Sequence, residues 1–132
     1  MTKQEVRDDL KDTEGQPLVK SRIRRLQREL ASRRMMAAVE TADVVVTNPT
    51  HYAVALEFEM SMMAAPQVVA KGQGYIALRI KEIAKEHDVP MVENVELART
   101  LYRSVEIGQE VPVDLYRAVA QILAHVYRLK RL

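Results

Sequence analysis

Hydrophobic and polar positions divide the chain into a polar first part and a mixed second part. Residues 1–17 show no apolar periodicity and contain a glycine and a proline, so they are predicted to form a flexible leader. Residues 19–40 place a sparse apolar stripe at helical spacing among six arginines, which predicts a strongly polar helix. We expect the first half of this helix to project from the body and its second half, around Met35, Met36 and Val39, to dock on it.

Strand patterns follow the helix. Four strands are predicted, over residues 42–47, 52–59, 67–71 and 89–93. The valine run at 44–46 is typical of a strand buried on both faces. Along the second strand large side chains alternate with small ones, so Ala53 and Ala55 leave room for a helix to lie close to one face.

Three more helices are predicted from apolar residues at helical spacing, over 75–87, 95–105 and 113–128. Asn94 is suited to cap the second of these helices, and Pro112 precedes the third. The third strand, the helix after it and the fourth strand predict a parallel βαβ unit with a right-handed crossover. The expected fold class is α/β, a small mixed β-sheet of about four strands packed with about four helices and preceded by a basic linker helix.

Composition sets limits on the class of protein. The chain has 132 residues, 48% hydrophobic and 29% charged, which is typical of one soluble globular domain with a single core. It has no cysteine, which excludes disulfides, thiolate metal ligands and cysteine nucleophiles. No apolar run reaches the roughly 18 residues of a membrane-spanning helix. Aromatic residues make up 5% of the chain, too few for a nucleic-acid surface of stacked rings.

The net charge of +2 conceals an uneven distribution. Residues 20–34 carry +6, whereas the segments before and after them carry −2 each. A strongly basic element therefore precedes a nearly neutral body. We divide the chain into a flexible leader and basic linker helix over 1–34 and a globular domain over 35–132.

The tetrapeptide Asn48-Pro49-Thr50-His51 stands directly between the first two predicted strands. One interpretation is a β-turn, because Asn suits its first position and Pro its second. The other is chemical. Pro49 has no backbone N–H, so its nitrogen cannot attack the Asn48 side chain, which is the usual route of asparagine degradation. The reverse reaction can still occur. In it the Asn48 side-chain nitrogen attacks its own main-chain carbonyl, closes a ring and expels the Pro49 nitrogen. Anchored flanking strands would favour this attack by orientation.

Thr50 and His51 lie where they could supply a proton to the leaving nitrogen or a hydrogen bond to the developing oxyanion. For His51 a purely structural role in the turn stays open beside proton transfer. For Thr50 we favour a hydroxyl bonded to its own backbone.

Other candidates are weaker. His87 and His125 have no partners at metal-ligand spacing, so no metal and no cofactor is predicted. Residues 71–74, Lys-Gly-Gln-Gly, lack a complete phosphate-loop pattern and are interpreted as a tight strand-to-helix turn. The methionines at 60, 62 and 63 are interpreted as core filling or a loose loop rather than a partner surface.

Seven segments carry a resemblance to a known family: 33–36, 42–56, 65–72, 77–80, 86–90, 105–108 and 127–130. In these segments the sequence resembles the cytoplasmic domain of the type III export switch proteins, the FlhB/YscU/SpaS family of flagella and injectisomes. The resemblance runs from about residue 11 to the end. The string ADVVVTNPTHYAVAL at 42–56 is more similar to the flagellar branch. One departure is Val95-Glu96, where family members commonly have a proline pair.

The resemblance implies that Asn48 is the self-cleaving residue, that Pro49 becomes a new amino terminus, and that Thr50 and His51 tune the loop. This would be a single autoproteolytic event rather than turnover catalysis, and the two fragments should stay associated within one sheet. The domain would control which substrates are exported. Implied partners are the export gate and other export-apparatus proteins, the ruler protein that reports hook or needle length, and the export substrates.

The resemblance also implies a location. Family members carry a membrane portion before this domain, so we expect this chain to be a segment on the cytoplasmic side of the bacterial inner membrane. Residues 20–34 would then lie near the membrane.

Two other functions stay open. The chain could be a nucleic-acid-binding module with residues 20–34 on phosphates, although the −2 charge of the body and the scarcity of aromatics argue against it. It could also be a plain protein-interaction domain in which Asn48-Pro49 is only a turn.

Overall fold

The computed structural model describes residues 16–130. The chain divides into two units, residues 1–34 and 35–132. The predicted leader lies outside the described residues except at its end, where the prediction is wrong: Pro17 begins helix α2 (Pro17–Val39). A proline fits the first turn of a helix because its missing N–H would have no partner there. Gln16 precedes it and its carbonyl accepts from Val19 N and Lys20 N.

In the first unit, the side chains of α2 from Lys20 to Arg34 are all exposed. The apolar residues Ile23, Leu26 and Leu30 are among them, as a sparse stripe on a polar helix predicts. Within residues 16–130 no helix has both the length and the apolar content that crossing a bilayer requires.

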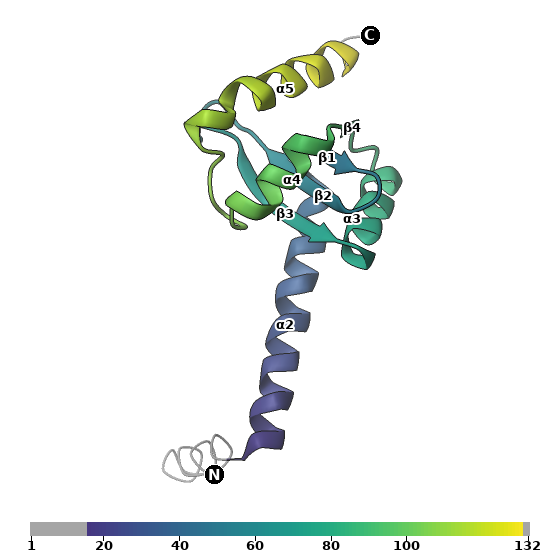
Figure 1. Cartoon of the computed structure of the whole chain (residues 1–132), viewed down its shortest axis with the longest axis vertical. Coiled ribbons are helices and arrows are strands. Elements are labelled where there is room, and N and C mark those ends of the chain that lie inside the picture. The colour runs from purple at the N-terminus through teal and green to yellow at the C-terminus, as the bar shows by residue number, and fades with distance from the viewer. Residues whose placement is uncertain (1–15, 131–132) are drawn as a thin grey trace. The chain divides into compact units, whose positions relative to one another are not determined.

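The second unit is built on a mixed sheet with strand order β3-β2-β1-β4 (Figure 1). Its strands are β1 (Val44–Asn48), β2 (Tyr52–Glu57), β3 (Gln67–Gln73) and β4 (Met91–Glu93). β2 pairs antiparallel with both β1 and β3, whereas β4 pairs parallel with β1. It follows that β3 and β4 run parallel, as predicted, but they lie at opposite edges of the sheet.

Three helices and a 3₁₀ turn complete this unit: α3 (Tyr75–Glu86), α4 (Val95–Ser104), η1 (Val113–Leu115) and α5 (Tyr116–Lys130). Helix α4 begins as predicted, because the Asn94 side chain accepts a hydrogen bond from Leu97 N at 3.1 Å. The predicted α/β fold class is confirmed. With α2 included, the described residues contain four α-helices and a four-stranded mixed sheet.

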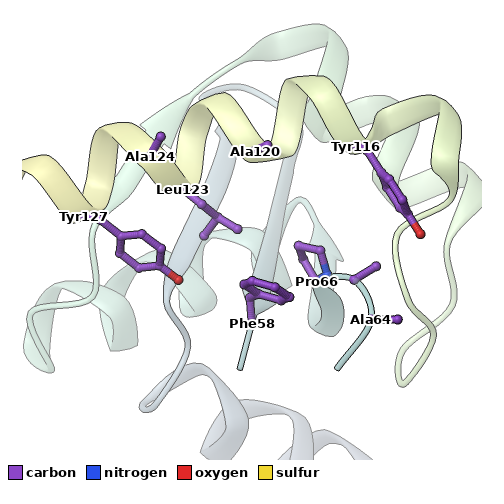
Figure 2. A pocket seen from close by; sticks show the side chains of 9 residues that line it. Phe58, Ala64, Pro66, Tyr116, Ala120, Leu123, Ala124 and Tyr127 are labelled. Atoms are coloured by element: carbon purple, nitrogen blue, oxygen red, sulfur yellow. The ribbon is translucent and has the colours of Figure 1, made fainter. Parts of the chain in front are cut away.

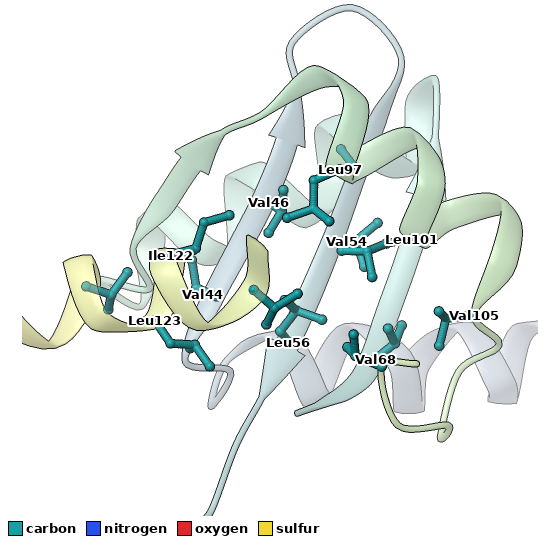
Figure 3. Close-up of a cluster of buried hydrophobic side chains, with 14 residues drawn as sticks. Val44, Val46, Val54, Leu56, Val68, Leu97, Leu101, Val105, Ile122 and Leu123 are labelled. Carbon is teal, nitrogen blue, oxygen red and sulfur yellow. The ribbon is translucent and has the colours of Figure 1, made fainter. Parts of the chain in front are cut away.

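The two faces of the sheet carry different side chains. On one face, apolar residues of β1, β2 and β3 pack against α4 and α5, and Leu56 and Leu101 are fully buried there (Figure 3). On the other face, Ala53 and Ala55 meet α3 and the last turn of α2 at Met35, Met36 and Val39. The expected docking of these three residues and the close approach of a helix to the alanines are confirmed. β1 is buried along its whole length.

Some predicted boundaries are wrong for local reasons. β2 ends at Glu57, because Phe58 N donates to the Asp43 side chain at 2.7 Å instead of continuing the ladder. The final helix begins at Tyr116, three residues late, since the chain after Pro112 first makes a 3₁₀ turn closed by Leu115 N and the Pro112 carbonyl. β4 begins at Met91.

β3 continues two residues beyond its predicted end, and Gly72 lies inside it, paired with Ala53. A Cβ atom at Gly72 would overlap the Ile76 Cγ2 methyl and lie 2.9 Å from Ile76 Cβ. The glycine therefore allows α3 to pack directly on the strand. The turn into the helix is made by Gly74, whose φ of 57° favours glycine.

Replacing Gly72 with Ala is expected to reduce the free energy of unfolding by about 1–3 kcal/mol, because the added methyl overpacks the α3 contact. Urea unfolding followed by circular dichroism measures this change. Ile76 is 44% exposed, so Ile76→Ala alone should cost little and the double variant should recover part of the loss. A Gly72→Ala variant as stable as the wild type would contradict this packing.

Candidate functional site

Residues 48–51 form the connection between β1 and β2. Asn48 pairs with Tyr52 as the last step of the antiparallel ladder. His51 N donates a hydrogen bond to the Asn48 carbonyl at 3.1 Å, which closes a β-turn with Pro49 in its second position. The predicted turn is therefore confirmed, and the bond between Asn48 and Pro49 lies at its start.

Asn48 is buried, with 6% of the residue exposed, and its side chain is bonded within the turn. Its Oδ1 accepts from Thr50 N at 3.3 Å and from Thr50 Oγ1 at 3.1 Å. A backbone N–H only donates, so the oxygen of the amide, not its nitrogen, must face Thr50. Nδ2 consequently points away from Thr50 and donates no hydrogen bond to another group within residues 16–130. No buried side-chain nitrogen in this part of the chain lacks a partner, so Nδ2 is open to solvent.

Thr50 and His51 extend this arrangement into a short chain of hydrogen bonds. Thr50 Oγ1 lies 2.6 Å from His51 Nδ1. The hydroxyl has one proton, and Asn48 Oδ1 takes it because that oxygen only accepts. His51 must therefore donate from Nδ1 to Thr50 Oγ1. The expectation that the Thr50 hydroxyl bonds to its own backbone is wrong, because its partners are the side chains of Asn48 and His51.

The two sides of the Asn48–Pro49 bond are anchored to different elements. Upstream, the Thr47 carbonyl accepts from Asn94 N at 3.0 Å, between β4 and α4. Downstream, the His51 carbonyl accepts from Gly74 N at 3.0 Å, and the Pro49 carbonyl accepts from Lys81 Nζ of α3 at 3.3 Å. The turn is thus restrained by the segments that follow the two edge strands of the sheet, β4 and β3.

Two surface hollows border the turn. The larger, of about 510 Å³, is lined by residues 48–52 together with Glu93, Val95, Arg99 and Arg103. The smaller, of about 120 Å³, lies toward α3 and is lined by Pro49, Thr50, His51, Gly74, Ala77, Leu78 and Lys81. Sequence reasoning missed Lys81, Arg99 and Arg103. The spacing of the two arginines, four residues apart on a helix, places them on one face and was an available signal.

Lys71 stabilises the C-terminal end of helix α4. Lys71 Nζ donates to the Tyr102 carbonyl at 2.9 Å and the Val105 carbonyl at 3.0 Å, and lies 3.7 Å from Glu106. These carbonyls end α4, so the ammonium group satisfies the helix C-terminus. The interpretation of residues 71–74 as a strand-to-helix turn is right only at Gly74, because residues 71–73 are still paired in β3. Tyr102 in turn stacks on Tyr52 with 4.7 Å between ring centroids.

A third, apolar pocket lies beneath α5 (Figure 2). It has a volume of about 310 Å³ and is lined by Phe58, Ala64, Ala65, Pro66, Tyr116, Ala120, Leu123, Ala124 and Tyr127. Burial and the nearby Asp43 carboxylate raise the pKa of the Tyr127 phenol. The sequence analysis did not predict this pocket, because its walls come from two segments far apart in the chain.

The methionines between β2 and β3 lie in a loop. Met60 and Met62 are 83% and 79% exposed, so the interpretation of these two as core filling is wrong and that of a loop holds.

Residues 1–126 match the family described as the FlhB HrpN YscU SpaS Family. The chain belongs to this family. It is 60% identical over 131 residues to the flagellar biosynthetic protein FlhB of Yersinia enterocolitica and 54% identical over 131 residues to that of Bacillus subtilis. These matches cover 99% of this chain but 34% and 36% of the two FlhB proteins, so it spans about a third of their length.

Solved structures support the family fold. The crystal structure of the cytoplasmic domain of FlhB from Shewanella putrefaciens is similar with a TM-score of 0.73 at 44% identity, covering 76% of this chain and 77% of that one. A mutated EscU C-terminal domain is similar with a TM-score of 0.68 at 30% identity, covering 70% and 92% respectively. The resemblance inferred from the sequence is confirmed.

For this FlhB-family chain, the hydrogen-bond chain at the turn predicts that neutral His51 carries its proton on Nδ1. The ¹⁵N chemical shifts of its ring at a pH above the imidazole titration measure this tautomer. Thr50→Val removes the acceptor of that proton and should shift His51 toward the Nε2–H form. His125 is exposed and provides the reference in the same spectrum. An Nε2–H tautomer in the wild type would contradict the arrangement.

Proposed function

We propose that this chain is the export-switch domain of a flagellar type III export apparatus and that it cleaves itself once, between Asn48 and Pro49. One observation carries the proposal. The turn holds Asn48 by its amide oxygen and leaves the amide nitrogen, the proposed nucleophile, without a hydrogen-bond partner among the described residues.

The reaction is a cyclisation. Asn48 Nδ2 attacks the main-chain carbonyl carbon of Asn48 and forms a five-membered succinimide ring. The bond between that carbon and the Pro49 nitrogen breaks, and the proton that Nδ2 loses is taken up by the Pro49 nitrogen, which leaves as a secondary amine. Water then opens the succinimide to a carboxylate and an amide. Pro49 favours this route because its nitrogen bears no proton for the competing attack on the side chain.

The turn supports the reaction by orientation and by charge. Its hydrogen bond from His51 N, 3.1 Å from the Asn48 carbonyl oxygen, points at the atom that becomes negative in the tetrahedral intermediate. Thr50 fixes the plane of the attacking amide through Oδ1. An amide nitrogen is a weak nucleophile, so a geometry fixed in advance is the main source of acceleration.

Cleavage would leave the fold intact. β1 remains paired with both β2 and β4, so the fragments of 48 and 84 residues stay in one sheet. Residues 49–51 lose their covalent link to β1 and gain freedom to move. We infer that this change at the surface alters which export substrates are accepted, and that the export gate and the ruler protein that reports hook length are the partners that sense it.

The location of the domain is part of the same proposal. We propose that the domain works on the cytoplasmic side of the bacterial inner membrane, and that the basic segment 20–34 lies near the membrane. The similarity to a cytoplasmic domain and the +6 charge of that segment support this location.

Asn48→Ala is expected to abolish cleavage, since it removes the nucleophile. Purified wild-type chain incubated near neutral pH should give fragments of 48 and 84 residues on a denaturing gel, the larger beginning at Pro49. The chain has two asparagines, so Asn94→Ala is a matched control that should still cleave. A wild-type chain that stays intact after long incubation would refute self-cleavage and favour a plain interaction domain.

A further inference from the structure

We propose that Arg99 and Arg103 of α4 bind the carboxylate that cleavage creates at residue 48. This inference rests on the proposed self-cleavage and adds a binding site for one of its products. The site is the larger hollow beside the turn, which is lined both by the residue that gains the negative charge and by the two arginines.

The hollow carries more positive than negative charge in the uncut chain. Arg99 and Arg103 are exposed and lie one helical turn apart, on the same face of α4. Within residues 16–130 neither arginine has a carboxylate within 4.0 Å. Glu93 is the one acidic side chain among the residues that line the hollow, so two cations face one anion and a turn that is uncharged when His51 is neutral.

Cleavage places a new anion in this hollow. If water opens the succinimide at the main-chain carbon, the product is the α-carboxylate of Asn48. If it opens the ring at the side-chain carbon, the product is an α-amide with a side-chain carboxylate. Both products carry one negative charge on residue 48, and a guanidinium group is suited to bind a carboxylate through two parallel hydrogen bonds.

The new amino terminus at Pro49 is affected by a different charge, that of Lys81. The new Pro49 amine is cationic at neutral pH, and the Lys81 ammonium donates a hydrogen bond to the carbonyl oxygen of the same residue. The new amine and the Lys81 ammonium are like charges near one residue, so they repel each other. The end of β1 is therefore held by α4 through its carboxylate, while residues 49–51 are released from α3.

The test compares the same arginine substitutions in a cleaved and an uncleaved chain. Arg99→Gln/Arg103→Gln is introduced into the cleaving chain and into the Asn48→Ala chain, and the rate of unfolding in a fixed urea concentration is followed by circular dichroism. In the cleaved chain the double substitution should speed unfolding about five-fold, as expected for two solvated ion pairs. In the Asn48→Ala chain, which has no new carboxylate, the change should stay below about two-fold.

Two further variants define the charge dependence. Glu93→Gln removes the competing anion and should slow the unfolding of the cleaved chain. Arg117→Gln/Arg128→Gln removes the same charge from exposed positions on α5 and should act equally in the cleaved and uncleaved chains. In about 1 M salt the arginine double substitution should change the unfolding rate of the cleaved and the uncleaved chain by nearly the same factor, because the ion pairs are screened.

Equal acceleration in both chains would overturn the proposal, since it would assign the arginines a structural role that is independent of cleavage. Unchanged unfolding of the cleaved double variant would also overturn it. A wild-type chain that remains a single band of 132 residues on the denaturing gel would refute the self-cleavage itself and the carboxylate site with it.

Discussion

The backbone of Asn48 is held as part of a strand while its side chain is held as part of a turn. As the last residue of β1 it pairs with Tyr52, in a strand that has neighbours on both sides. As the first residue of the turn it accepts hydrogen bonds from His51 N at its carbonyl and from Thr50 at its amide. These restraints limit the positions of the attacking amide and of the carbonyl beside the Pro49 nitrogen, and the proposed chemistry depends on them.

The rest of the domain supports this turn from two directions. The connection from β4 to α4 holds Thr47, and the connection from β3 to α3 holds His51. Gly72 lets α3 lie directly on the sheet, which brings Lys81 to the Pro49 carbonyl. Because each side of the turn has its own anchor, breaking the bond between Asn48 and Pro49 frees a short surface segment and leaves the core in place. A local chemical event can therefore change the surface without unfolding the domain.

Sequence patterns predicted the strands, the helices and the turn because these depend on neighbouring residues. The valines of β1, the alternation along β2 and the Asn94 cap are all local signals. The larger hollow was not predictable in this way. It joins the turn to Glu93, Arg99 and Arg103, which are more than 40 residues away in the chain, and one sequence without the sheet order does not bring them together. The apolar pocket beneath α5 was missed for the same reason.

The dependence of cleavage on the folded turn is tested most directly by comparing the native chain with the chain unfolded in urea. Newly purified protein is divided between buffer and concentrated urea at the same pH and temperature, and the appearance of the fragments of 48 and 84 residues is followed by mass spectrometry. If the fold orients the Asn48 amide, cleavage proceeds in buffer and stops in urea. Equal rates in the two solutions would show that the dipeptide reacts without help from the fold and would contradict this account.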